Sequence, residues 1–265
     1  MGIKSWSQSD LPPTKGRFVG MERIGWGISC FSSECTGRNN PMNLRFSVEV
    51  GRNTVSSAVM SASRVHILGA GLNPEAPANS AVHDISKMGW SPVPIHPRDA
   101  GGSIGGYPIR PMIEEGIKPE IVVLFLAPLR ARDAVKKLLL TNQGPPPLIW
   151  FQNGAEDEMS ENWLHDAGWH FVKLDCIVRF MQRNNMTREP IQSPWFRQVR
   201  DEDNTGCSTW TVHEYREGSS PPDSKLEWVG DLQDLETSNA IVPRYIRSLV
   251  DEGEALEACA RRLAQ

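Results

Sequence analysis

Cysteines are few in this chain, and their spacing suggests neither a metal site nor a disulfide framework. The 265 residues include five of them: Cys30, Cys35, Cys176, Cys207 and Cys259. Cys30 and Cys35 form one C-x4-C pair without a second pair, which argues against structural zinc. An odd number of scattered cysteines is typical of a reducing compartment, so we expect a cytoplasmic protein.

Long apolar runs are also absent. The longest, residues 121–129, is too short to cross a bilayer and contains Pro128. The N-terminus has no apolar segment of the kind that directs secretion. Its first 60 residues are rich in serine and carry more basic than acidic side chains, which leaves organellar targeting open. We therefore expect no membrane contact.

Excess charge is missing too, because the formal net charge is only -4. Such a balance gives no reason to expect a nucleic-acid partner. An anionic cofactor would then need a local basic patch. Hydrophobic residues make up 39% of the chain, and the middle third is much richer in them. We divide the chain into an N-terminal extension (1–62), a core (63–185) and a C-terminal extension (186–265).

The core alternates strand-like with helix-like segments. Strands are expected at 64–68, 91–95, 121–126, 148–151 and 169–172, and helices at 74–88, 111–115, 130–140 and 156–167. Alternation of this kind is typical of a parallel sheet covered by helices. We predict an α/β fold with a Rossmann-like three-layer core. Its sheet should be mainly parallel, with five or six strands in the order 3-2-1-4-5.

The two extensions offer weaker patterns. Residues 44–50 alternate apolar with polar side chains, which predicts a strand with one exposed face. Residues 210–215 and 226–229 predict a hairpin across a turn at 219–223. A last helix is expected to begin near Pro243, because proline suits the first turn of a helix.

A glycine turn follows the first core strand. Gly69, Ala70 and Gly71 lead to Asn73 and Pro74, where a helix is expected to begin. This arrangement directs backbone N–H groups and the positive end of a helix dipole at one point, where a phosphate can bind. The dinucleotide fingerprint needs a third glycine, and Pro74 stands there instead. An ordinary tight turn is therefore the alternative.

A basic turn, His96-Pro97-Arg98, follows the second core strand. Folds that bind NAD commonly place an acid there to hold the ribose hydroxyls. A basic pair suits an extra phosphate instead, as in NADP or in the 3′-phosphorylated ADP of coenzyme A. The alternative is a solvated Arg98 beside a capped His96.

Residues 64–180 resemble the coenzyme A-binding domain family, small Rossmann-like proteins related to the CoA-binding part of succinyl-CoA synthetase. The matching segments follow the family's order and are 68–74, 92–97, 104–108, Phe125, 149–154, 167–168 and 175–176. The most specific element is the Trp-x-Gln-x-Gly motif at 150–154, followed by Ala-Gly and a terminal Cys. The resemblance covers less than half of the chain.

The resemblance implies a cofactor site along the carboxyl ends of the strands. Its residues would be Gly69, Ala70, Gly71, Asn73, His96, Pro97, Arg98, Phe125, Gln152, Gly154 and Cys176. The pyrophosphate would follow the glycine turn, and the adenosine would lie near the basic turn. Two positions depart from the family. His96 replaces the usual Asn, and Asp175 replaces a basic residue before the last Cys.

No catalytic set stands out. His165 and His170 are candidates for phosphorylation by residue type alone, and neither lies in a glycine-flanked loop. We therefore expect a module that binds coenzyme A or an acyl-CoA without catalysis. The alternatives are an NADP-dependent oxidoreductase and an interaction scaffold with a ligand-free core. A homo-oligomer or a protein partner bound through the terminal extensions is left open.

Overall fold

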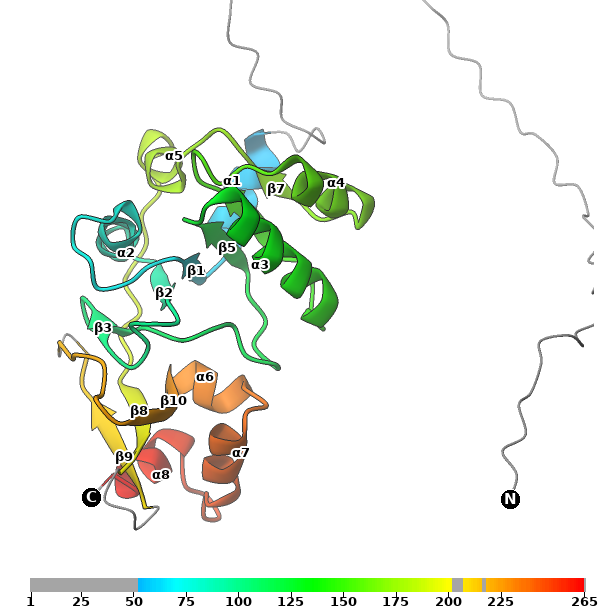
Figure 1. The fold of residues 1–265 in the computed structure, drawn as a ribbon. Helices are drawn as coiled ribbons and strands as arrows, with labels where there is room; N and C mark the ends of the chain where they lie inside the picture. Colours follow the sequence, from blue (N-terminus) through cyan, green and yellow to red (C-terminus); the bar gives the residue numbers. More distant parts are fainter. Residues whose placement is uncertain (1–51, 202–206, 216–217, 265) are drawn as a thin grey trace, which may run out of the picture. The chain divides into compact units, whose positions relative to one another are not determined.

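Five short strands, mostly apolar and buried, form the central sheet (Figure 1). They are β1 (Arg64–Leu68), β2 (Ser91–Ile95), β5 (Ile121–Leu124), β6 (Leu148–Phe151) and β7 (Phe171–Val172). All neighbours in this sheet are parallel, in the order β2-β1-β5-β6-β7. The computed structural model describes residues 52–201, 207–215 and 218–264. The predicted α/β, Rossmann-like fold is confirmed.

The outer edge of β2 explains why the predicted strand order is wrong. Counted along the chain, the core strands lie in the order 2-1-3-4-5, not 3-2-1-4-5. Pro92 and Pro94 have no N–H to donate, and alternation along the strand puts both positions on the side away from β1. Within the described residues, only a parallel bridge between Ile95 and Arg110 extends the sheet beyond this edge.

Helices cover both faces of the sheet. On one face lie α1 (Arg52–Ser61), α2 (Pro77–Lys87) and α5 (Ile177–Arg183), and on the other α3 (Pro128–Thr141) and α4 (Glu158–Asp166). Successive side chains of a strand point to opposite faces. Accordingly Val123 packs with the α2 layer, while Val122 and Leu124 pack with the α3 layer. The predicted three layers are confirmed.

Several predicted elements need correction. Residues 111–115 form no helix; the Glu114 carboxylate instead accepts hydrogen bonds from Ser238 and Trp228. The preceding segment, residues 101–108, contains a small ladder of β3 (Ser103–Ile104) and β4 (Tyr107–Pro108). Helix α1 was not predicted, although its buried residues Val55 and Val59 belong to the core. The strand predicted at 44–50 lies outside the described residues.

The C-terminal part forms a second sheet, which we call the C-terminal sheet. It contains β8 (Trp195–Arg200), β9 (Ser208–His213) and β10 (Lys225–Asp231), antiparallel in the order β10-β8-β9. The predicted hairpin is wrong, because β8 lies between its two strands. Three helices pack beside the sheet, namely α6 (Leu232–Thr237), α7 (Ile241–Ser248) and α8 (Leu256–Arg262). The last two replace the single terminal helix that we expected near Pro243.

A buried group of four charges joins the two sheets; we call it the charge cluster. Arg64 of β1 and Arg110 each pair with Asp231 and Asp234. The Nη2 atom of Arg110 lies 2.6 Å from Asp234 Oδ2 and 2.8 Å from Asp231 Oδ2. The same two acids form the capping box of α6. The cluster therefore fixes the first turn of a C-terminal helix against the first core strand.

The described residues fall within one compact unit, Leu44–Gln265. Our division of the chain at 62 and 185 stays a prediction. None of the described helices is long and apolar enough to cross a membrane.

Replacing Arg110 should destabilise the fold strongly. In Arg110→Met, Arg64 is the only arginine that still pairs with the two carboxylates of the cluster. The free energy of unfolding should therefore fall by about 3–5 kcal/mol. The matched control is Arg200→Met, since Arg200 is half exposed and pairs with Glu227 near the surface. Its loss should stay below about 1 kcal/mol. Urea unfolding measures both, and equal losses would contradict the role of the cluster.

His66 should make stability depend on pH. Burial, and then the charge of Arg64, lower the pKa of His66 from 6.5 to about 3. Between these two pKa values, His66 is protonated in the unfolded chain and neutral in the folded chain. The free energy of unfolding therefore falls as the pH drops from 6.5 towards 3. His66→Leu should remove about one proton from the pH dependence of unfolding between pH 6.5 and 4.5. The exposed His165→Leu should leave that dependence intact; an unchanged slope in the His66 variant would contradict the assignment.

Candidate functional site

The candidate site lies where the parallel strands end. Gly69 follows β1, His96 follows β2, Phe125 follows β5, and Gln152 follows β6. The carboxyl ends of parallel strands meet at one edge, which is where open α/β sheets bind their ligands. The structure thus brings four of the sequence-predicted segments to the same edge of the sheet.

The glycine turn is shaped by close backbone contacts. Gly69 has a φ of +96°, and its N–H donates to the carbonyl of Ile95 at 2.9 Å. A Cβ at Gly69 would lie 2.3 Å from the carbonyl oxygen of Phe125. Only glycine fits this position, because it is surrounded by the backbones of β1, β2 and the end of β5.

A carboxylate of the chain itself occupies the turn. Asp99 Oδ2 accepts the N–H of Leu72 at 2.8 Å, and a Cβ at Gly71 would lie 2.3 Å from that same oxygen. His96 Nδ1 lies 3.1 Å from Asp99 Oδ2, without the geometry of a hydrogen bond. Sequence reasoning missed Asp99. The sequence contained one indication of its role. Asp99 lies four residues after the second strand, close to the position at which Rossmann folds carry the acid that binds the ribose.

The remaining residues of the two turns have separate surroundings. Ala70 is buried in the core on the α2 side. Asn73 is exposed, and its side chain accepts the N–H of Glu75. Pro97 and Arg98 are exposed, and Arg98 forms no ion pair within the described part of the chain. His96 therefore faces the glycine turn, while Arg98 extends into solvent.

Gln152 and Gly154 follow β6. Gln152 is only 6% exposed, yet its side-chain Nε2 has no hydrogen-bond partner among the described residues. Gly154 has a φ of +89° and open space around the position of a Cβ. Buried polar groups normally have a partner. Gln152 therefore carries a buried donor without a partner among the described residues at this edge.

Cys176 immediately precedes α5 as its N-cap residue and is partly buried against the core. Asp175, which departs from the family pattern, accepts the N–H of Cys176 at 2.8 Å. Its carboxylate also pairs with Arg183 at 2.6 Å. The negative charge of Asp175 is thus partly compensated.

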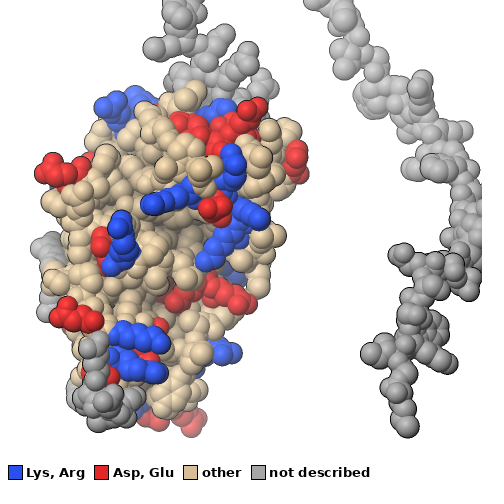
Figure 2. All heavy atoms as spheres, viewed as in Figure 1, with Lys and Arg blue, Asp and Glu red and all other residues tan. Residues whose placement is uncertain are grey.

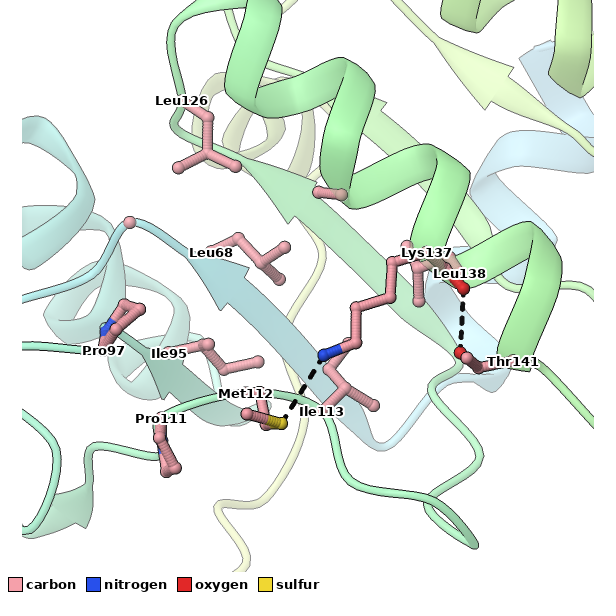
Figure 3. Close-up of a pocket in the computed structure, with 12 residues that line it drawn as sticks. Leu68, Ile95, Pro97, Pro111, Met112, Ile113, Leu126, Lys137, Leu138 and Thr141 are labelled. Atoms are coloured by element: carbon pink, nitrogen blue, oxygen red, sulfur yellow. Dashed lines mark hydrogen bonds between the residues drawn. The ribbon is translucent and has the colours of Figure 1, made fainter.

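An apolar cavity of about 180 Å³ lies beside the glycine turn, between the sheet and α3 (Figure 3). Its lining is Leu68, Gly69, Ile95, Pro97, Pro111, Met112, Ile113, Leu126, Ala134, Lys137, Leu138 and Thr141. Of the sequence-predicted residues, only Gly69 and Pro97 line it. One face of α3 contributes residues 134, 137, 138 and 141 to this lining. Their helical spacing could have indicated a shared face from the sequence, but the sequence analysis did not use it.

Lys137 extends from α3 across this cavity. Its Nζ lies 3.5 Å from Met112 Sδ on the opposite wall, as Figure 3 shows. The helix also carries Arg130, Arg132 and Lys136. In Figure 2, basic side chains gather on this face of the molecule over α3. Arg132 is paired with Asp157, and of these basic side chains Lys137 is the one that lines the cavity.

A second, more polar hollow of about 350 Å³ adjoins the cavity; we call it the outer hollow. It shares Pro97 and Pro111 with the cavity and also includes Arg98, Glu114 and Trp228. Trp228 Nε1 donates to Glu114 at 3.1 Å, and burial raises the pKa of Glu114. The C-terminal sheet therefore supplies one wall beside the candidate site. Within the described residues, no three His, Cys, Asp or Glu side chains are arranged to hold a metal ion.

Comparison with known proteins gives one family and several solved structures. Residues 63–181 match the family described as "CoA binding domain". No curated protein matches the chain. A hypothetical protein from Pyrococcus horikoshii OT3 is 20% identical, with a TM-score of 0.47, over 54% of this chain and 97% of that one. Cell-free ID.343 from Thermus thermophilus is 23% identical, with a TM-score of 0.46, over 51% and 98%.

Two glycines of the site should differ sharply in their tolerance of alanine. Gly69→Ala and Gly154→Ala both force a side chain into positive φ, which costs roughly 1–2 kcal/mol. Only Gly69→Ala also drives its methyl group into a backbone carbonyl, so its free energy of unfolding should fall by about 1–3 kcal/mol more. Urea unfolding of the two variants compares them. Equal losses would show that the contact with Phe125 relaxes freely.

Proposed function

We propose that the chain binds coenzyme A or an acyl-CoA at the carboxyl edge of its central sheet, because residues 63–181 match the CoA binding domain family. The apolar cavity beside the glycine turn carries the proposal. Ligand sites are typically concave, mainly apolar, and equipped with a few polar groups that orient the ligand. In α/β folds they lie at this edge of the sheet.

The cavity suits the uncharged part of such a ligand. Leu68, Ile95 and Leu126 give it apolar walls, and Pro97 and Pro111 add flat ring faces. A volume of about 180 Å³ can hold a heteroaromatic base or a short acyl group. Charged phosphates would remain at the mouth, where Lys137 of α3 lines the cavity.

Gln152 supports a ligand at the same edge. Its buried Nε2 has no partner within the described residues, and an unmet buried donor costs free energy. An acceptor oxygen of a bound ligand would offset that cost. Binding would therefore be favoured at the end of β6 as well as at the end of β1.

We assign binding and not catalysis. Among the described residues that line the cavity, the titratable side chain is Lys137, and no general base or nucleophile stands beside it. The partner is accordingly a small nucleotide cofactor, with a cytoplasmic location as our expectation from the cysteines. NADP remains the alternative cofactor from the sequence.

A ligand-free scaffold is the second candidate, and one observation favours it. Asp99 already accepts the N–H of Leu72 that a phosphate oxygen would otherwise use. A core that has lost its ligand would keep such an internal substitute. The two functions differ in whether any nucleotide binds at all.

Calorimetry with coenzyme A, dephospho-CoA, NADPH and NADH should give the highest affinity for coenzyme A. Gly71→Ala should weaken this binding at least about tenfold, because the new methyl group displaces Asp99 and His96 at the turn. Gly218→Ala is the matched control, since nothing lies within 4 Å of a Cβ there. Equal affinity for all four nucleotides, or no binding, would overturn the proposal and favour the scaffold.

A further inference from the structure

Lys137 forms no ion pair with any of the described residues. Its Nζ contacts the thioether of Met112, a weak acceptor, and the ammonium group has three protons to donate. Asp133, one turn earlier on α3, makes no ion pair with it within the described residues. The side chain is exposed at the mouth of an otherwise apolar cavity. This arrangement leaves its charge available to an anionic group on a ligand.

The other candidate cations near the turns are less well placed. Arg98 is exposed and lines the outer hollow, not the cavity, on the other side of Pro97 and Pro111. Glu114 and Glu227 line that hollow with it. A phosphate bound beside Arg98 would therefore meet two carboxyl groups, which weakens the attraction.

The glycine turn is also unfavourable for a second phosphate next to β2. Asp99 places a carboxylate within hydrogen-bonding distance of the Leu72 N–H, and His96 lies close to the same oxygen. A ribose phosphate would be repelled there. The charges around the cavity thus favour the α3 side over the β2 side.

We propose that Lys137 is the specificity-determining residue that recognises the ribose phosphate of a 3′-phosphorylated adenosine nucleotide. The adenine would occupy the apolar cavity between Pro97, Pro111 and Leu126, with the ribose at its mouth. The phosphate would take the place of the Met112 sulfur as acceptor for Nζ. This assignment rests on the proposed function and names the contact that separates coenzyme A from dephospho-CoA.

The ratio of affinities for coenzyme A and dephospho-CoA tests the assignment, measured by calorimetry on the full chain. Wild-type protein should prefer coenzyme A by at least about tenfold, the range of a charge-assisted hydrogen bond. Lys137→Gln should bring the ratio to about one, because it removes the charge that distinguishes the two ligands. Lys137→Arg should keep most of the preference, since it retains the charge.

Two controls remove a single charge nearby. Lys136→Gln changes the next residue of the same helix, which is exposed but does not line the cavity, and the preference should stay. Arg98→Gln removes the cation of the basic turn, and the preference should also stay. A ratio that collapses in Arg98→Gln, or survives in Lys137→Gln, overturns the assignment while the proposed function stands.

Failure of the proposed function gives a different result. If wild-type protein binds neither nucleotide, both the function and the assignment fall. If it binds the two equally, the assignment falls and coenzyme A binding remains. If an acyl-CoA binds tighter than coenzyme A and the ribose phosphate has no effect, the cavity holds the acyl group and the assignment is wrong.

Discussion

The charge cluster is the interaction on which the rest of the structure depends. Arg110 follows β4 and continues directly into residues 111–113, which form a wall of the apolar cavity. By pairing with Asp231 and Asp234, Arg110 fixes that wall against the C-terminal sheet. Arg64 ties the same acids to β1. The shape of the candidate site is thus set partly by residues outside the 63–181 match.

Four buried charges are not an efficient source of stability. Replacing such groups by apolar side chains is often neutral or stabilising, whereas removing one partner is costly. Their arrangement here has a geometric consequence, because each arginine reaches both acids of one capping box. A shifted α6 would leave Arg64 and Arg110 buried without acceptors. The cluster therefore discriminates strongly against other placements of the C-terminal helices.

The sequence was sufficient for the fold class and for the approximate positions of the five core strands, because these strands carry local signals. The strand order depends on contacts between strands and was predicted wrongly. Segment 121–126 is apolar throughout and became the buried strand β5, and the glycine turn followed β1 as its composition required. The candidate site was harder to predict, because Asp99 and Lys137 become part of it only through contacts with residues from other elements of the fold. Neither the approach of Asp99 to Gly71 nor that of Lys137 to Met112 follows from spacing along the chain. The strand β8 was missed for a similar reason, because its partners lie on either side of it in space.

The prolines of β2 have a consequence for self-association. A strand at the edge of a sheet is an open template for a strand from another molecule. Pro92 and Pro94 remove the outward N–H groups of β2, and Arg110 already donates to the outward carbonyl of Pro94. At the opposite edge, β7 has only two residues in the ladder. Within the described residues, β2 and β7 are therefore both poor templates for extending the central sheet into that of a second copy.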